Sequence, residues 1–203
     1  MINVFIRKIF FFPSEVRHVF YRRFYRICFR LRGIHYGKRM RVFDSMYIKG
    51  RGQICIGDNF TFVSGGINPL NRNIKGCIYT KQPQAKIIIG NNVGVSSSVI
   101  WCNNSIHIGN NVLVGANCII IDDDAHPIDF LNRRLRVGGG NSAPIVIEDD
   151  VWIGMNCIIL KGITIGARSI IGAGSVVTKS IPSDVVAAGN PCQIIRHINV
   201  ENK

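Results

Sequence analysis

The chain has no apolar run long enough to cross a membrane. Residues 2–12, INVFIRKIFFF, are apolar and aromatic but include Arg7 and Lys8 and end at Pro13. This run is well short of the ~20 residues that a membrane-spanning helix requires. Because no cleavage site of small residues follows it, a secretory signal peptide is not expected either.

Acidic residues are scarce, with 12 Asp and Glu against 25 Lys and Arg, which gives a formal net charge of +13. Much of the positive charge lies between Arg7 and Arg51. Basic charge alone does not identify a nucleic-acid-binding protein, and no recognised module for nucleic acid accompanies it. We therefore do not expect nucleic acid as a partner.

Metal-binding and disulfide patterns are missing as well. The seven cysteines include no CxxC pair and no zinc-like spacing, and the five histidines show no ligand spacing. We therefore expect no bound metal. Reduced thiols favour a cytoplasmic protein.

What the chain does contain is a six-residue repeat between residues 147 and 182. Branched residues recur there at a strict interval of six: Ile147, Ile153, Ile159, Ile165, Ile171 and Val177. A helix with 3.6 residues per turn does not hold a period of six on one face, and a plain strand repeats every two residues. A chain that turns a corner every six residues does, and three such sides form one coil of a triangular parallel β-solenoid.

In such a coil the branched residue points inward and stacks on its counterpart in the next coil. Cys118 and Cys157 occupy the inward position for small residues, so we expect both to be buried, reduced thiols. The 21 glycines fit a fold with many tight corners. The sequence therefore predicts an all-β solenoid.

The basic N-terminal segment, residues 1–50, is predicted to be helical. A helix begins near Ser14 and ends at Gly33, with an apolar stripe formed by Val16, Phe20, Phe24, Ile27 and Leu31. One interpretation is that this helix covers the open end of the solenoid. The other is that it lies as a basic amphipathic helix on an anionic membrane face, which would make the protein peripheral at the inner membrane.

Solenoid strands are expected from about Ile54, in a domain covering residues 51–200. The six-residue pattern is lost at residues 68–85 and again at residues 122–144. Long irregular excursions inside a compact domain are usually functional. After the last coil, Ile194, Ile195 and Ile198 suggest a short C-terminal helix that folds back.

The segments IEDDVWIG and IGAGSVVTKSIPSDVVAAGNPCQIIRHI, preceded by the loop DDDAHPID, resemble the hexapeptide-repeat acyltransferases. The similarity covers about residues 54–200 and is greatest to the sugar O-acetyltransferase branch, which includes galactoside and maltose acetyltransferases and acetyltransferases of surface polysaccharide pathways. It implies a left-handed parallel β-helix, an exception to the usual right-handed crossover. It also implies a homotrimer with active sites between subunits, and acetyl-CoA as the acetyl donor without a metal.

His126 matches the catalytic histidine of that family. Acetylation of a hydroxyl requires removal of its proton, and an imidazole has a suitable pKa for this near neutral pH. A carboxylate beside the ring would fix its tautomer. The sequence does not choose among four candidates: Asp122, Asp123, Asp124 and Asp129. Asp124 is our provisional assignment.

The resemblance also assigns further site residues. A family asparagine that contributes to the site corresponds here to Ser97, and this departure affects the fine geometry and the choice of acceptor. The positions expected to contact CoA are Trp152, Gly154, Ala173, Thr178, Lys179 and Arg196, whereas a second basic position is Gln193 here. Lys179 and Arg196 have no structural role in the repeat, so a contact with phosphate explains them better.

We therefore expect an acetyl-CoA-dependent O-acetyltransferase that acts on a sugar hydroxyl of a glycan or glycan precursor. The alternatives are an N-acetyltransferase of an amino-sugar, an acetyltransferase of another small acceptor such as serine or an antibiotic, and a non-catalytic β-solenoid. A metal-dependent relative of the hexapeptide carbonic anhydrases would need three metal-binding histidines, which this sequence does not supply. Acceptor contacts are expected from residues 68–85 and 122–144.

Overall fold

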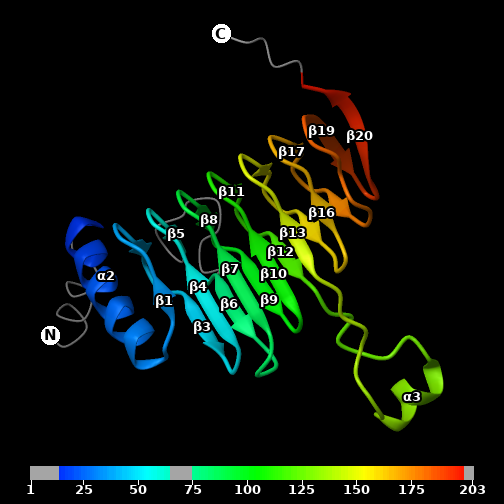
Figure 1. Ribbon diagram of the computed structural model, residues 1–203, viewed down its shortest axis with the longest axis horizontal. Helices are drawn as coiled ribbons and strands as arrows, with labels where there is room; N and C mark the ends of the chain where they lie inside the picture. Colours follow the sequence, from blue (N-terminus) through cyan, green and yellow to red (C-terminus); the bar gives the residue numbers. More distant parts are fainter. Residues whose placement is uncertain (1–13, 65–74, 199–203) are drawn as a thin grey trace, which may run out of the picture.

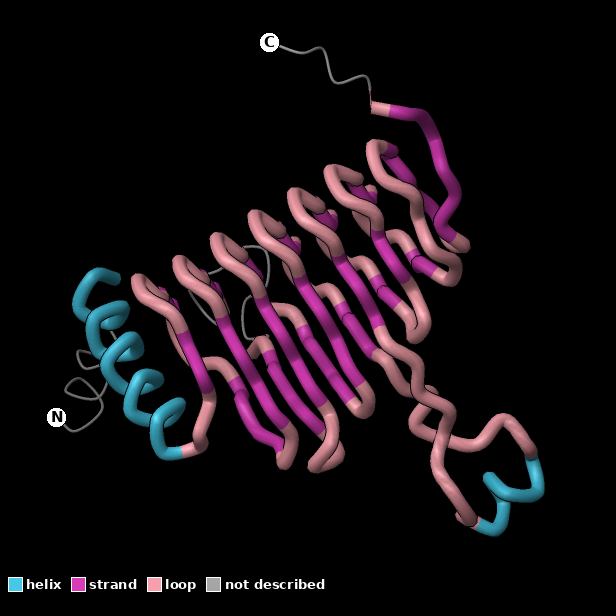
Figure 2. Tube along the Cα trace, viewed as in Figure 1, coloured by secondary structure: helices cyan, strands magenta, loops and turns pink. Residues whose placement is uncertain are grey.

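Three parallel β-sheets form the sides of a long prism (Figures 1 and 2). The computed structural model describes residues 14–64 and 75–198, and the side chains from residue 19 onwards within the first range. Each coil of the chain contributes one strand to each sheet in the order A, B, C.

The strands of each sheet follow one another along the prism axis. Sheet A consists of β1 (His35–Tyr36), β4 (Gln53–Ile56), β7 (Lys86–Ile89), β10 (Ser105–Ile108), β13 (Ile145–Ile147) and β16 (Thr164–Ile165). Sheet B consists of β2 (Arg41–Phe43), β5 (Thr61–Val63), β8 (Gly94–Ser96), β11 (Leu113–Val114), β14 (Trp152–Ile153), β17 (Ile170–Ile171), β19 (Val185–Gly189) and β20 (Cys192–His197). Sheet C consists of β3 (Tyr47–Gly50), β6 (Cys77–Thr80), β9 (Val99–Cys102), β12 (Ile119–Ile121), β15 (Ile158–Ile159) and β18 (Val176–Val177).

The six-residue repeat forms the core as predicted. Ile147, Ile153, Ile159, Ile165, Ile171 and Val177 are all fully buried. Each stacks in register on a residue of the neighbouring coil, as Ile153 does between Val114 and Ile171. Burial of one such side chain stabilises the fold by about 1.5–3 kcal/mol. Cys118 and Cys157 are buried free thiols, as expected.

Helix α2 (Ser14–Leu31) covers the N-terminal end of the prism, against β1 and β2 (Figure 1). It ends before Gly33, whose φ of 64° is in the left-handed region that favours glycine at a helix end. The predicted capping helix is therefore present. None of the helices in residues 14–64 and 75–198 is long and apolar enough to span a membrane.

The face of α2 that packs on the solenoid differs from the predicted stripe. Tyr25 and Phe29 are buried, whereas Phe20, Phe24, Ile27 and Leu31 are exposed, and Val16 lies where side chains are not described. The reason is that the helix has two apolar faces, and the hydroxyl group of Tyr25 determines which of them packs on the solenoid. The Tyr25 hydroxyl donates to the carbonyl of Met46 (2.8 Å) and accepts from its N–H (2.7 Å).

Two predicted boundaries also differ from the structure. Strands β1 to β3 already form a coil, so the solenoid begins at His35 and includes residues assigned to the 1–50 segment. In the irregular stretch 68–85, β6 joins sheet C with Ile78 buried, while residues 68–74 lie outside the described residues.

The predicted C-terminal helix is wrong. Residues 192–197 form β20, which turns back at Asn190–Pro191 and pairs antiparallel with β19. Because β19 ends the row of sheet B, its free edge offers backbone hydrogen bonds to a returning strand, and Ile194 and Ile195 suit an extended backbone.

One segment leaves the prism. Residues 122–144, here called the arm, connect β12 of sheet C to β13 of sheet A and carry the short helix α3 (Phe130–Leu135) away from the body (Figures 1 and 2). Asp129 caps α3 by accepting a hydrogen bond from the Asn132 N–H at 2.8 Å. No residue of α3 is buried, so the described solenoid does not hold this helix in place.

Candidate active site

A groove of about 490 Å³ follows the outer face of sheet B and its corner with sheet C. It brings together three of the predicted CoA-binding residues, Trp152, Gly154 and Ala173, and Ser96 and Gly115 of earlier coils also line it. Trp152 follows the buried Val151 and points outward, with 52% of its surface exposed. A flat aromatic ring beside exposed backbone suits an extended, mostly apolar ligand arm.

The glycine in this groove is required by the stacking of coils. A Cβ on Gly154 would lie 2.6 Å from the backbone nitrogen of Ala173 in the next coil. Only glycine permits that approach, and the exposed Ala173 beside it keeps the groove shallow. The small residues therefore serve the fold and open the surface at the same time.

The other predicted CoA residues lie elsewhere. Thr178 and Lys179 follow β18, at the corner between sheets C and A, where Lys179 is exposed. Arg196 is exposed on β20, opposite Val186. One chain therefore does not bring Thr178, Lys179 and Arg196 into the groove that contains Trp152.

His126 is exposed at the start of the arm. Its backbone N–H donates to the carbonyl of Asp124 at 2.7 Å, which holds the residue in a turn. The imidazole itself makes no hydrogen bond to any residue that the structure describes. A ring in this position is free to accept a proton from a bound acceptor.

The four candidate carboxylates all bind other groups. Asp122 is fully buried and accepts hydrogen bonds from the N–H groups of Asn103 and Asn104, at 2.6 and 2.8 Å. Asp123 pairs with Lys81 at 2.8 Å. Both carboxylates therefore tie the base of the arm to sheet C.

The remaining two belong to the arm. Asp124 pairs with Lys161 at 2.9 Å, and Asp129 caps α3. None of the four carboxylates orients the imidazole in the described part of the chain. The role of Asp124 beside His126 stays a prediction, and no spacing in the sequence pointed to Lys81 or Lys161 as competitors for these carboxylates.

Ser97 lies at the corner between sheets B and C and is only 1% exposed. Its N–H donates to the carbonyl of Val63 at 2.7 Å, and its φ is 38°. The neighbouring Ser96, rather than Ser97, lines the groove. Ser97 is therefore buried beside the groove and is not one of its lining residues.

The pKa of three of the cysteine thiols is raised. Burial, and then the charge of Asp122, raises the pKa of Cys102 to about 12, and burial raises the pKa of Cys77 to about 11. The hydrogen bond with Cys157, followed by burial, raises the pKa of the Cys118 thiol. Since the thiolate is the reactive form, these three cysteines are suited to packing and not to covalent catalysis.

The topology separates the two halves of the candidate site. His126 leaves the corner between sheets C and A, whereas the groove lies on sheet B, the side of the prism opposite that corner. Each side of a coil is about five residues of strand, or roughly 16 Å. A single chain therefore keeps the imidazole away from its own groove.

Comparison with known proteins agrees with this architecture. The bacterial transferase hexapeptide family (six repeats) matches residues 144–179. A putative acetyltransferase of Schizosaccharomyces pombe is 49% identical over 96 residues, which are 47% of this chain and 45% of the relative. The galactoside O-acetyltransferase of Escherichia coli is 47% identical over 100 residues, 49% of this chain and 47% of the relative. The chain thus spans about half the length of these curated relatives.

Among solved structures, a mutant of the N-acyltransferase AntD from Bacillus cereus, in complex with dTDP and coenzyme A, has a TM-score of 0.65. It is 18% identical, with 83% of this chain and 87% of that chain covered. At this identity the likeness shows the fold. The repeat and the coil geometry agree with the match of residues 144–179 to the hexapeptide-repeat transferases. Over about half of its length the chain is also similar to galactoside O-acetyltransferases.

Proposed function

We propose that this protein transfers the acetyl group of acetyl-CoA to a hydroxyl of a sugar in a glycan or glycan precursor. The observation that carries this proposal is the groove containing Trp152, Gly154 and Ala173, in the segment that matches the hexapeptide transferase family. The similarity to galactoside O-acetyltransferase supports a sugar as the acceptor. The exposed, unpaired imidazole of His126 supplies the base that the reaction needs.

The chemistry follows from these groups. The acceptor hydroxyl loses its proton to His126 as its oxygen attacks the thioester carbonyl, and the tetrahedral intermediate then collapses. The C–S bond breaks, the CoA sulfur leaves, and the imidazolium returns the proton to it. His126 ends in its starting form, so no metal or external acid is required.

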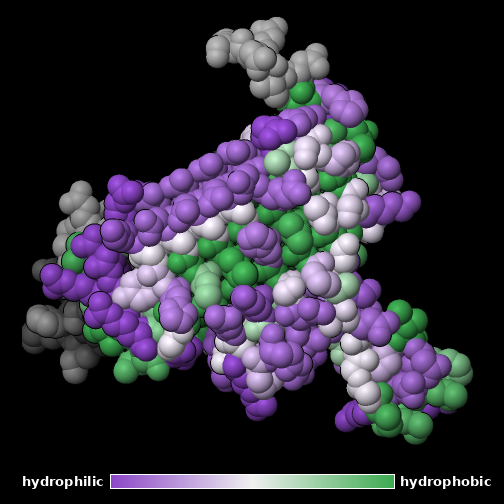
Figure 3. Space-filling view, viewed as in Figure 1, coloured by the Kyte–Doolittle hydropathy of each residue, from purple (hydrophilic) through white to green (hydrophobic). Residues whose placement is uncertain are grey.

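The same proposal includes a homotrimer built from left-handed coils. Since one chain separates His126 from the groove, a second copy has to bring an arm to it, and a ring of three closes such a head-to-tail contact. The arm exposes apolar side chains that suit burial against a neighbour: Ile128, Phe130, Leu131, Leu135 and Val137. They gather as green atoms on the projecting arm in Figure 3.

Sedimentation velocity tests the assembly. The wild type should sediment as a trimer, and Ile128→Ser combined with Leu135→Ser should shift it toward the monomer without unfolding it. A wild type that remains a monomer at all concentrations would contradict the shared site.

Contact with a membrane surface in the cytoplasm is the remaining part of the proposal. The outer face of α2 presents Phe20 and Ile27 beside the exposed Arg23 and Arg30, a combination that binds anionic bilayers. Co-sedimentation with vesicles of phosphatidylglycerol should be lost in Phe20→Ser/Ile27→Ser and weak with phosphatidylcholine. Equal co-sedimentation of the wild type and Phe20→Ser/Ile27→Ser with phosphatidylglycerol vesicles would contradict membrane contact through α2.

Release of CoA thiol in the presence of candidate sugars tests the reaction itself. His126→Ala should lower the rate about 10²–10⁴-fold, the usual contribution of a general base. His107→Ala is a matched control, because it removes an exposed imidazole from sheet A. Amino-sugars tested beside hydroxyl acceptors separate O- from N-acetylation, and equal rates for wild type and His126→Ala with every acceptor would refute the assignment of His126.

A further inference from the structure

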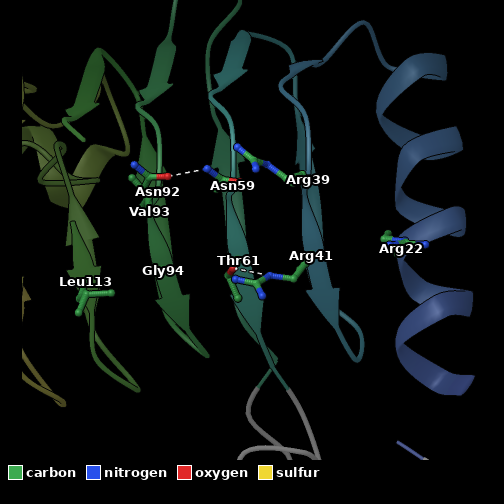
Figure 4. Close-up of a pocket in the computed structure, with 9 residues that line it drawn as sticks. All are labelled: Arg22, Arg39, Arg41, Asn59, Thr61, Asn92, Val93, Gly94 and Leu113. Carbon is green, nitrogen blue, oxygen red and sulfur yellow. Dashed lines mark hydrogen bonds between the residues drawn. The ribbon is translucent and has the colours of Figure 1, made fainter. Parts of the chain in front are cut away.

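A second cavity, of about 720 Å³, lies at the N-terminal end of sheet B and is lined by α2 and the first four coils (Figure 4). Its polar lining consists of Arg22, Arg39, Arg41, Asn59, Thr61 and Asn92. None of these residues belongs to the positions that the resemblance assigns to CoA or catalysis. The sequence shows this cluster only as part of a basic segment, because three different elements supply the arginines.

Arg39 stands where the next three coils have asparagine, at Asn59, Asn92 and Asn111. Arg39, Asn59 and Asn92 all have φ between 56° and 59° at the same corner. The asparagines form a ladder in which Asn59 donates to Asn92 at 2.6 Å and Asn92 donates to Asn111 at 2.9 Å. Asparagine tolerates this backbone better than arginine does. The corner itself therefore does not call for arginine, and Arg168, the arginine at this corner in a later coil, is paired with Asp184.

Arg41 lies two residues further along the same coil, at the start of β2. Its Nε donates to the Thr61 hydroxyl at 3.2 Å, which fixes the direction of the guanidinium. In Figure 4, the side chains of Arg39 and Arg41 both extend from the first coil across Asn59 and Thr61 of the second. The guanidinium groups of Arg39 and Arg41 therefore lie over the same part of sheet B.

The charges in this cavity are of one sign. Of the nine described residues that line it, three are arginines and none is acidic. The Nε of Arg22 is buried and has no hydrogen-bond partner in the described part of the chain. Arg22 lines this cavity from α2, across from Arg39 and Arg41 on the first coil. Three guanidinium groups around one cavity favour an anion, and the planar guanidinium group binds the oxygens of phosphate in pairs.

The arginine cavity is continuous with the groove that contains Trp152. It shares Thr61, Gly94 and Leu113 with a hollow of about 290 Å³ on the next strands. That hollow in turn shares Ser96, Gly115 and Trp152 with the groove. Four strand spacings separate β2 from β14 in the order of sheet B, a distance of roughly 19 Å.

We propose that the arginine cavity binds a phosphate or diphosphate group carried by the acetyl acceptor, so that the acceptor is a phosphorylated sugar. This inference rests on the proposed acetyl transfer. The phosphoryl group occupies the cavity of Arg22, Arg39 and Arg41, and the sugar extends along sheet B toward the thioester. The same chemistry comes from a nucleotide-linked sugar in solution or from a lipid-linked one.

Calorimetric titration of the full chain with inorganic pyrophosphate at low salt tests the site without any acetyl transfer. The test variant is Arg39→Asn/Arg41→Gln, because asparagine continues the ladder and glutamine keeps the length of the side chain. The control is Lys49→Gln/Arg51→Gln, which removes the same charge from exposed positions on and just after β3. The test variant should bind at least about tenfold more weakly than wild type, and the control should bind like wild type.

Equal pyrophosphate affinity in the wild type and in Arg39→Asn/Arg41→Gln overturns the inference. Equal weakening in the test and control variants also overturns it, because diffuse charge then explains the binding. Specific weakening together with unchanged acetyl transfer in His126→Ala leaves the phosphate site standing and refutes only the proposed function.

The source of the phosphate is found with two further ligands, uridine diphosphate in solution and a polyprenyl diphosphate in phosphatidylcholine vesicles. The ligand whose binding Arg39→Asn/Arg41→Gln weakens, and the control does not, identifies the source. Weakening of both supports the shared chemistry, and weakening of neither overturns the site.

Discussion

The six-residue repeat at residues 147–182, here called the block, and the arm at residues 122–144 are close in the chain but are held by different forces. In the block, every sixth residue is buried and stacked on the next coil. In the arm, the helix α3 buries nothing, and the base is tied down by Asp122 and Asp123. The block thus supplies stability and a groove, whereas the arm presents the exposed imidazole of His126. Stability and chemistry should therefore respond to different substitutions.

Removal of the arm should have the largest effect on activity. Asp124 and Asn141 lie side by side, since the Asp124 N–H donates to the Asn141 carbonyl at 3.0 Å. An Asn-Gly pair in place of residues 125–140 would close this hairpin with a two-residue turn. We expect acetyl transfer to fall about 10³-fold or more, while the melting temperature of the chain in monomeric form changes little.

A large drop in the melting temperature would contradict this contrast, because it would show that the arm contributes to folding. Retained activity would show that the base lies elsewhere. As a control, circular dichroism of the variant with the closed hairpin should show, before any assay, that its block is still folded.

Ile153→Ala should have the opposite signature. Ile153 is fully buried between Val114 and Ile171, and such truncations cost about 2–5 kcal/mol. Urea unfolding measures the loss. Ile195→Ala removes the same atoms from the exposed strand β20 and should change stability by no more than about 0.5 kcal/mol. Similar losses in the free energy of unfolding of Ile153→Ala and Ile195→Ala would contradict the assignment of Ile153 to the core.

The difference between regular coils and the remaining segments also explains which parts of the fold could be predicted from the sequence. The register of the block follows from a period that only a three-sided coil satisfies, so each inward residue from Ile147 to Val177 was predictable. The buried face of α2 was not, because two apolar stripes compete and Tyr25 decides through its bonds to Met46. The strand β20 depends on the free edge of β19, which local sequence does not reveal.

The arrangement of the candidate site residues followed from the sequence in the same uneven way. Trp152, Gly154 and Ala173 lie in regular coils, and the structure brings them together in one groove. The partners of the arm carboxylates, Lys81 and Lys161, come from positions 42 and 37 residues away from Asp123 and Asp124 (123 − 81 and 161 − 124). Such pairs depend on how coils stack, and no motif marks them.

A substitution in the groove should change binding and leave folding intact. Ala173→Tyr places a large side chain where the exposed Ala173 lines the groove. We expect the KM for acetyl-CoA to rise about tenfold, equivalent to about 1.4 kcal/mol of lost binding, with the melting temperature unchanged. Arg51→Tyr, exposed just after β3, is the control, and an unchanged KM in Ala173→Tyr would move the donor site away from this groove.

The smallest expected effect concerns acid stability of the block. The Arg168 guanidinium donates to both carboxylate oxygens of Asp184, at 2.6 Å each, and this hydrogen bond holds the pKa of Asp184 below its ordinary value. A lowered pKa in the folded state stabilises the fold above the pKa of the unfolded chain, near 3.9, and this contribution is lost as the pH falls through the folded value. Because the pair is exposed, solvent screens it.

Urea unfolding should therefore give a slightly larger free energy of unfolding for wild type than for Asp184→Asn at pH 7. The difference should shrink below about pH 4 and with added salt. A difference that stays constant over this range would show that the ion pair does not link the last coil to the block.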